Sequence, residues 1–204
     1  MDKEYKKRIM KSIKKIAKKM GFHTIADYIY KKDDNLIIYA LYWIDGNNKI
    51  SFRWCFKTIE IDNLFWDIFC MPENKEKSFS IRINGAFCCP PYIFWEERAY
   101  DIVNTENIER MEEEIAVILG KNAEQVTKYL SEIINNYSNF YEYMVARDDS
   151  DDLIKMLSYI LLGEYKYVYK LAKQNIKNGE SGGFENKGKD IYEYIKKYCR
   201  KKYK

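Results

Sequence analysis

The amino-acid sequence predicts an α+β protein in which an antiparallel sheet packs on an N-terminal helix and is followed by an all-helical C-terminal half. Three observations predict this class. Residues 2–20 place apolar side chains at helical spacing, residues 36–59 carry strand patterns, and no proline follows Pro91. Because proline interrupts helices, the remainder is free to be helical. We therefore predict an α+β antiparallel-sheet domain over 1–104 and a helical region over 105–204 packed on or beside it.

The composition predicts an ordinary globular chain. Its 204 residues are 47% hydrophobic and 16% aromatic, which excludes a disordered chain and supplies enough apolar surface for a core without a metal or a disulfide framework. The five cysteines form an odd count without framework spacing, and no apolar run approaches the length of a membrane span. We therefore expect a cytoplasmic protein with reduced thiols and no membrane association.

The first predicted element is the Lys-rich helix over 2–20, whose apolar stripe faces the core while the lysines face water. Gly21 is placed to end this helix in the left-handed conformation that glycine adopts readily. Phe22 then stands where a Schellman motif requires an apolar contact back onto the last turn of the helix.

Three strands and one short helix follow. Leu36–Ile44 is apolar on both faces, whereas Lys49–Ile59 and Phe79–Asn84 alternate apolar and polar side chains as half-buried strands do. Between the last two, Asp62 is placed to cap a short helix that ends at Phe69. The three strands are expected to form the sheet.

The turn at 45–48 predicts the register of the hairpin between the first two of these strands. A four-residue connection pairs Trp43 with Ile50 and Leu41 with Phe52. This register places the apolar side chains of both strands on one side of the sheet, and a shift by one residue would turn them to the other side.

Helix-ending signals divide the second half of the chain. Gly120 followed by Asn122 predicts one break, and Gly163 and Gly179 predict two more. A mobile loop is expected over 180–188. The predicted helices are 105–119, 123–136, 138–147, 151–162, 164–178 and 189–202.

The net charge of +4 conceals two basic ends. Residues 1–20 hold nine bases against two acids, and residues 186–204 hold eight against two, so the segment between them is acidic. Basic segments of this kind contact nucleic acid or anionic surfaces in some proteins and are solvated helix faces in many others. Both interpretations, a binding surface for anions and a solvated helix face, stay open.

Common catalytic arrangements are missing from the sequence. His23 is the single histidine and follows a predicted helix end, where a capping or surface role is usual. The adjacent Cys88 and Cys89 lack the spacing of a redox or zinc motif, and no phosphate-binding glycine loop or nucleophile elbow occurs. We predict no catalytic, cofactor-binding or metal-binding residue and no cofactor.

The polar face of the predicted sheet is the candidate binding surface. Two of the seven arginines share this face, and arginine forks bind carboxylates and phosphates. Single-stranded nucleic acid would require exposed aromatic side chains among these bases, and the predicted aromatics face the other way. The candidate residues are Tyr42, Ser51, Arg53, Lys57, Ser80, Arg82 and Asn84.

The first half of the chain resembles uncharacterised bacterial domains of unknown function, some of which are immunity-protein-like and lie near polymorphic toxin loci. The resemblance rests on the Lys-rich helix that ends at Gly21-Phe22, on the Phe52-Arg53-Trp54 strand and on Ile81-Arg82-Ile83. It implies an α+β fold and a partner-binding role of the immunity type, and it transfers no functional residue.

These observations lead to a non-enzymatic protein-binding module with a protein partner as the first functional hypothesis, of immunity or regulatory type. The alternative is a nucleic-acid-binding protein that uses the Lys-rich terminal helices. A second alternative is an enzyme without histidine chemistry, which would need a deep pocket around Cys55 or Glu96. Sequence alone leaves the oligomeric state open.

Overall fold

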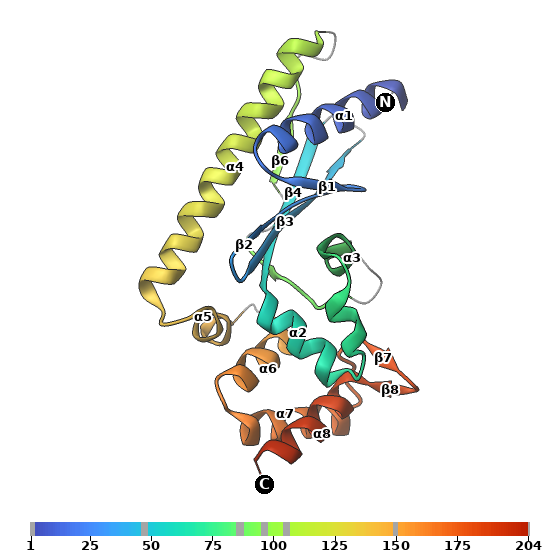
Figure 1. Ribbon diagram of the computed structural model, residues 1–204, viewed down its shortest axis with the longest axis vertical. Helices are drawn as coiled ribbons and strands as arrows, with labels where there is room; N and C mark the ends of the chain where they lie inside the picture. Colours follow the sequence, from blue (N-terminus) through green and yellow to red (C-terminus); the bar gives the residue numbers. More distant parts are fainter. Residues whose placement is uncertain are drawn as a thin grey trace. The chain divides into compact units, whose positions relative to one another are not determined.

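The structure is a computed structural model that describes residues 3–45, 49–84, 88–94, 98–103, 107–148 and 151–203 (Figure 1). The helices are α1 (Lys3–Lys19), α2 (Ile59–Ile68), the 3-10 helix η1 (Pro72–Glu76), α3 (Phe79–Asn84), α4 (Ile108–Asn136), α5 (Phe140–Ala146), α6 (Asp152–Leu161), α7 (Tyr165–Asn178) and α8 (Ile191–Lys202). The strands are β1 (His23–Ile25), β2 (Tyr28–Asp33), β3 (Leu36–Ile44), β4 (Lys49–Thr58), β5 (Tyr92–Ile93), β6 (Arg98–Asp101), β7 (Glu185–Asn186) and β8 (Lys189–Asp190).

The predicted α+β class is confirmed: an N-terminal helix precedes an antiparallel sheet, and the C-terminal half is helical apart from the small β7–β8 hairpin. The larger sheet has the order β1-β2-β3-β4-β5, and β6 also pairs with β4. Across the described ranges, no helix has both the length and the apolar character needed to cross a bilayer.

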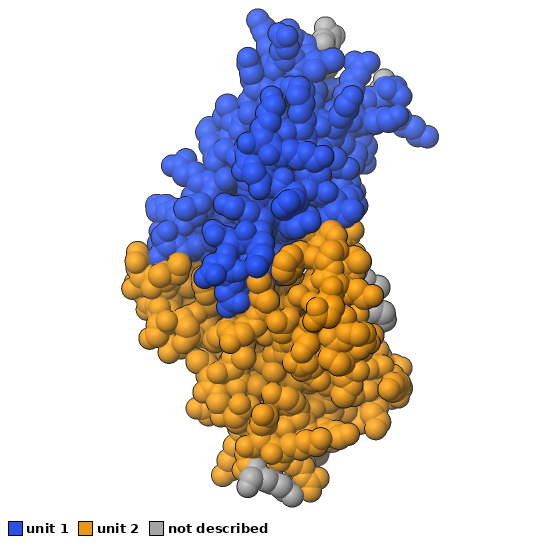
Figure 2. All heavy atoms as spheres, in the orientation of Figure 1, with its two compact units in different colours: residues 1–56, 93–132 blue, residues 57–92, 133–204 orange. Residues whose placement is uncertain are grey.

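The chain divides into two compact units that each combine two stretches of sequence (Figure 2). Unit 1 holds residues 1–56 and 93–132, and unit 2 holds residues 57–92 and 133–204. The predicted division into 1–104 and 105–204 stays a prediction.

Helix α1 ends as predicted. Gly21 has a φ of 82°, its amide donates to Lys18 O, and the Phe22 amide donates to Ala17 O at 2.9 Å. These two bonds define a Schellman motif, which satisfies carbonyls that the helix end leaves free. The Phe22 ring then meets Trp54 of β4 edge to face, so the motif directs the chain from the helix onto the sheet.

The pairing of β3 with β4 differs from the predicted register. The Asp45 amide donates to Lys49 O at 3.0 Å, and the Tyr42 ring lies 6.2 Å from Phe52, the residue that the prediction placed opposite Leu41. A one-residue shift turns a strand's side chains to the opposite face. Tyr42 is accordingly buried beside Phe52, whereas Leu41 is only half-buried. Residues 46–48 of the predicted turn lie outside the described residues.

A buried amide links the sheet of unit 1 to α4. Asn122 is fully buried, and its Oδ1 accepts a hydrogen bond from Trp54 Nε1 at 3.1 Å. Its Nδ2 donates to Tyr100 OH at 3.0 Å and to Ile118 O at 2.8 Å. Buried polar groups cost free energy unless they are paired, so these bonds fix the position of α4 against β4 and β6.

The predicted helix break at Gly120 is wrong, because α4 runs without interruption from Ile108 to Asn136. Asn122 was expected to cap a new helix, but its side chain is occupied by Trp54 and Tyr100 instead. Tertiary hydrogen bonds therefore override the local helix-ending signal.

Replacement of Gly120 by alanine tests this continuous helix. We expect Gly120→Ala to stabilise the protein by about 0.5–1 kcal/mol, because alanine favours a helix interior over glycine and the added Cβ meets nothing within 4 Å. Urea unfolding followed by circular dichroism measures the change. A loss of stability would indicate a left-handed helix stop at this residue.

Two further predictions are corrected in unit 2. Helix α2 begins at Ile59 with Thr58 as its N-cap, so Asp62 lies inside the helix and does not cap it. Residues 79–84 form α3 and not a strand, with Arg82 N bonded to Ser78 O. Arg82 and Ile83 are adjacent and both buried, which a helix permits and a strand with one buried face does not.

Aromatic side chains form part of the core of unit 2. The Phe65 ring stacks on Phe69 at 5.4 Å and meets Phe184 edge to face at 5.0 Å. Helices α7 and α8 pack along each other, and α6 packs on α7. The contacts of Phe184 with Phe65 and Phe69 hold the segment that leads into β7 against α2.

Candidate functional site: a basic cleft in unit 2

The structure divides the seven predicted binding residues between the two units. Four of them are buried, namely Tyr42, Ser51, Lys57 and Arg82. Of the other three, Arg53 and Asn84 are exposed and Ser80 is half-buried. The predicted polar face also lacks its third strand, because residues 79–84 form the helix α3.

Lys57 and Arg82 are brought together, but in the interior of unit 2. Lys57 Nζ donates to Asp62 Oδ1 at 2.6 Å and to Arg82 O at 2.7 Å, while Arg82 Nε donates to Asp62 Oδ2 at 2.5 Å. Arg82 also donates to Asn63 Oδ1 and Lys75 O. Lys57 and Asp62 are 0% exposed, so these charges hold α2, α3 and the end of β4 together and are inaccessible to a ligand.

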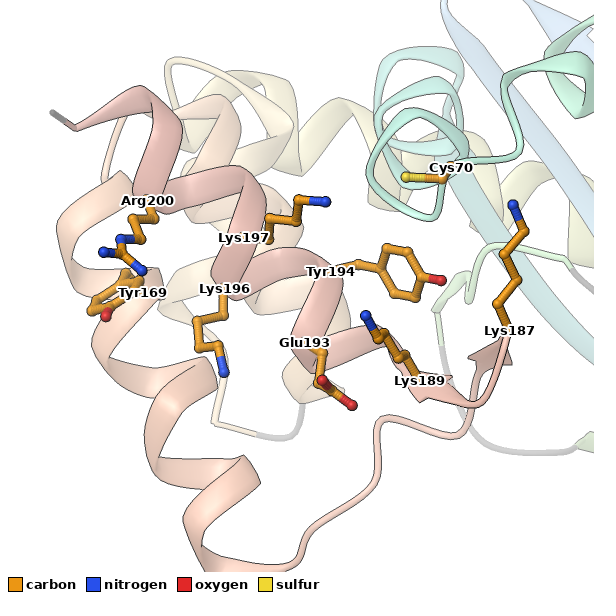
Figure 3. Close-up of a pocket in the computed structure, with 9 residues that line it drawn as sticks. All are labelled: Cys70, Tyr169, Lys187, Lys189, Glu193, Tyr194, Lys196, Lys197 and Arg200. Atoms are coloured by element: carbon orange, nitrogen blue, oxygen red, sulfur yellow. The ribbon is translucent and has the colours of Figure 1, made fainter.

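The accessible site is a basic cleft of about 490 Å³ in unit 2 (Figure 3). Its lining comes from α8, from the β7–β8 hairpin, from α7 and from the segment that follows α2. Five of its nine residues are cations and one is an acid. The residues that line it are Cys70, Tyr169, Lys187, Lys189, Glu193, Tyr194, Lys196, Lys197 and Arg200.

Helix α8 turns a charged face to the cleft because its sequence is amphipathic. Ile191, Tyr192, Ile195 and Cys199 are buried on one side of this helix. Glu193, Lys196, Lys197 and Arg200 recur at the spacing of the opposite face. The apolar side anchors the helix in unit 2, so the cations are displayed on a fixed backbone.

Asp190 holds the hairpin beside this helix. Its Oδ1 accepts from the Tyr192 amide at 2.9 Å as the N-cap of α8, and its Oδ2 accepts from Ser181 Oγ at 2.6 Å and from the Gly182 amide at 3.0 Å. One carboxylate thus fixes both the start of α8 and the loop that leads into β7. The predicted mobile loop over 180–188 is therefore tied to unit 2 by hydrogen bonds.

The hairpin tip places two lysines at the cleft. Lys187 and Gly188 have φ of 51° and 70°, the conformation of a tight two-residue hairpin turn between Asn186 and Lys189. A lysine pays a conformational cost at a positive φ. The Asn186 side chain donates to Phe69 O at 2.9 Å, so the turn is fastened to the end of α2.

Tyr194 lines the cleft, and two contacts hold its side chain in place. Its hydroxyl donates to Asn186 O at 2.8 Å, and its ring meets Phe69 edge to face at 5.6 Å. Partial burial, together with Cys70 and Glu193 nearby, raises the pKa of this hydroxyl above its ordinary value.

The positive charge of the cleft is not neutralised by the protein. Within the described ranges, none of its five cations forms an ion pair. Glu193 is the single acid in the lining. An anion that enters the cleft therefore meets unpaired donors and a positive local potential.

The other residues that sequence reasoning considered lie elsewhere. His23 is on β1, with its ring 5.2 Å from Tyr30. Cys55 and Cys89 are buried, and burial raises the pKa of the Cys89 thiol, which makes it unreactive. Glu96 lies outside the described residues, and the enzyme hypothesis, which needs a deep pocket around Cys55 or Glu96, stays a prediction.

Comparison with known proteins found no match to this chain among protein-family models, curated proteins or solved structures. The fold and the cleft define an α+β protein with a basic, tyrosine-containing cleft in its C-terminal unit.

Proposed function

We propose that the protein is a non-enzymatic nucleic-acid-binding protein that uses the basic cleft of unit 2 to contact the phosphate backbone. The observation that carries this proposal is the set of five cations without an ion-pair partner among the described residues, gathered from α8 and the hairpin around one hollow. Unpaired lysines and arginines supply most of the affinity of proteins for nucleic acids by displacing counterions from phosphates.

The proposal selects one of the two basic ends predicted from the sequence. Around the C-terminal end, cations from two separate elements converge on a cleft. Along α1 the lysines occupy the exposed side of a single helix, and Lys15 is already paired with Glu112 at 2.7 Å. A convergent set of charges binds a phosphate chain better than the same charges spread over a convex helix face.

The protein-binding hypothesis loses four of its seven candidate residues, because Tyr42, Ser51, Lys57 and Arg82 are buried. A protein partner, the immunity-type role and the cytoplasmic location stay predictions. The nucleic-acid proposal needs none of these buried residues.

Two charge-matched double variants test the proposal. Lys197→Gln/Arg200→Gln removes two exposed cations from the cleft, and Lys7→Gln/Lys11→Gln removes two exposed cations from α1. Both variants lose the same net charge. Binding of a fluorescently labelled mixed-sequence oligonucleotide is measured by anisotropy at low salt. We expect the cleft variant to bind about tenfold more weakly and the α1 variant to bind nearly as the parent does.

Equal losses in the two variants would mean that only net charge matters and would overturn the assignment to the cleft. The absence of binding to any oligonucleotide at low salt would overturn nucleic-acid binding altogether. Circular dichroism of both variants serves as a control, since all four residues are exposed and their replacement leaves the fold unchanged.

A further inference from the structure

The cleft contains two tyrosines, and each has cations beside it (Figure 3). Tyr169 of α7 lies with Arg200 at one end of the opening. Tyr194 of α8 lies with Lys187 and Lys189 at the other end. An aromatic ring next to a cation is the combination that binds an unpaired base together with its phosphate.

We infer that the cleft selects single-stranded nucleic acid and stacks two bases of one strand on Tyr169 and Tyr194 while the surrounding cations contact the phosphates. This inference rests on the proposed function and adds the class of nucleic acid to it. Base-to-aromatic stacking tolerates any sequence, because every base has a π-face.

The form of the site favours a single strand over a duplex. A volume of about 490 Å³ falls within the range of clefts that enclose small ligands, and it suits one or two unpaired nucleotides. Duplex readers work in the opposite way, since they project a helix or a β-ribbon into a groove about 12 Å wide. Bases stacked inside a duplex also have no free face to offer a tyrosine.

The two rings are held before a ligand arrives. Tyr194 is fixed by the hydrogen bond from its hydroxyl to Asn186 O and by the edge-to-face contact of its ring with Phe69. Tyr169 packs edge to face with Tyr203 at 5.2 Å. Both rings are half-buried, so part of each remains accessible. Ordering these side chains on binding therefore costs little free energy, which favours stacking.

Glu193 adds an acidic hydrogen-bond acceptor to the basic cleft. Its carboxylate repels a phosphate and accepts hydrogen bonds, so it suits the amino groups of bases or a sugar hydroxyl. Phosphates are then expected along the cationic rims formed by α8 and the hairpin, with the bases directed into the hollow.

Tyrosine variants of the full chain separate stacking from charge. We expect the protein to bind a labelled single strand at least tenfold more tightly than the matched duplex at the same salt concentration. Tyr169→Leu lowers the single-strand affinity by about tenfold, while Tyr169→Phe retains it because the ring remains. Inorganic polyphosphate, which has charge and no bases, binds Tyr169→Leu and the parent equally.

The outcomes distinguish the two proposals. If the duplex binds as tightly as the single strand, or if Tyr169→Leu leaves the single-strand affinity unchanged, stacking is overturned while phosphate binding stands. If Tyr169→Leu weakens polyphosphate binding as much as oligonucleotide binding, the ring acts only by supporting the cations, and the inference also fails. If neither single strand nor duplex binds, the proposed function fails first.

Discussion

Replacement of Asp62 by asparagine is expected to lower the free energy of unfolding by about 3–5 kcal/mol. Among the described residues the carboxylate is the single anion that bonds to Lys57 and Arg82, and all three side chains are buried in unit 2. Asparagine has nearly the same volume, so the change removes the charge without opening a cavity. Two cations then face each other across a neutral amide, which is costly in the interior of a protein. Thermal and urea unfolding measure the loss.

Two controls locate the origin of this effect. Asp67→Asn breaks the partly exposed pair with Lys75 and is expected to cost less than about 1 kcal/mol, since water screens such pairs. Lys57→Met is expected to cost less than Asp62→Asn, because it leaves Asp62 paired with Arg82 in the same interior. A cost for Asp62→Asn as small as that of Asp67→Asn would contradict the buried charge cluster.

The second large effect is expected at Asn122 in unit 1. Asn122→Leu is expected to destabilise the protein by about 1–3 kcal/mol, because Trp54 Nε1 loses its acceptor and the Tyr100 hydroxyl loses its amide partner. Leucine fills most of the volume, so the loss reports on hydrogen bonding more than on packing. Urea unfolding followed by tryptophan fluorescence measures the change.

Thr127→Ala provides the matched control on the same helix. The Thr127 hydroxyl donates only to Ala123 O one turn earlier and is exposed, so its removal is expected to change stability by less than about 0.5 kcal/mol. Equal effects at Asn122 and Thr127 would show that the buried amide does not connect α4 to the sheet.

Local patterns predicted the fold class and several elements because they act over short stretches of chain. The apolar stripe of residues 2–20 and the stop at Gly21 reappear in the structure. The alternation predicted for β4 does not, because Ser51, Cys55 and Lys57 on the predicted polar face are buried and only Arg53 of that face is exposed. The errors arise where distant residues decide the outcome. Arg82 lies in a helix and donates to the buried Asp62, and Asn122 accepts from Trp54 and does not cap a helix.

The sequence pattern indicates only some of the residues that line the cleft. The basic C-terminal segment was recognised, and the spacing of Lys197 and Arg200 on one face of α8 could have placed them together. Cys70 and Tyr169, in contrast, reach the cleft through tertiary packing that no local pattern records. Lys187 lies in the segment expected to be a mobile loop. In the structure it occupies a two-residue turn with a positive φ, a position where asparagine is usual before glycine.

Salt dependence of oligonucleotide affinity tests the central claim most directly. The logarithm of the affinity of the parent protein for a single strand, measured from about 50 to about 200 mM salt, is expected to fall linearly with the logarithm of salt concentration. Removing Lys197 and Arg200 should reduce the magnitude of that slope by about 1.4, since each phosphate contact on a single strand contributes about 0.7. The Lys7→Gln/Lys11→Gln variant should keep the slope of the parent. A slope that is unchanged in the cleft variant, or reduced equally in both variants, would contradict a phosphate-binding cleft in unit 2.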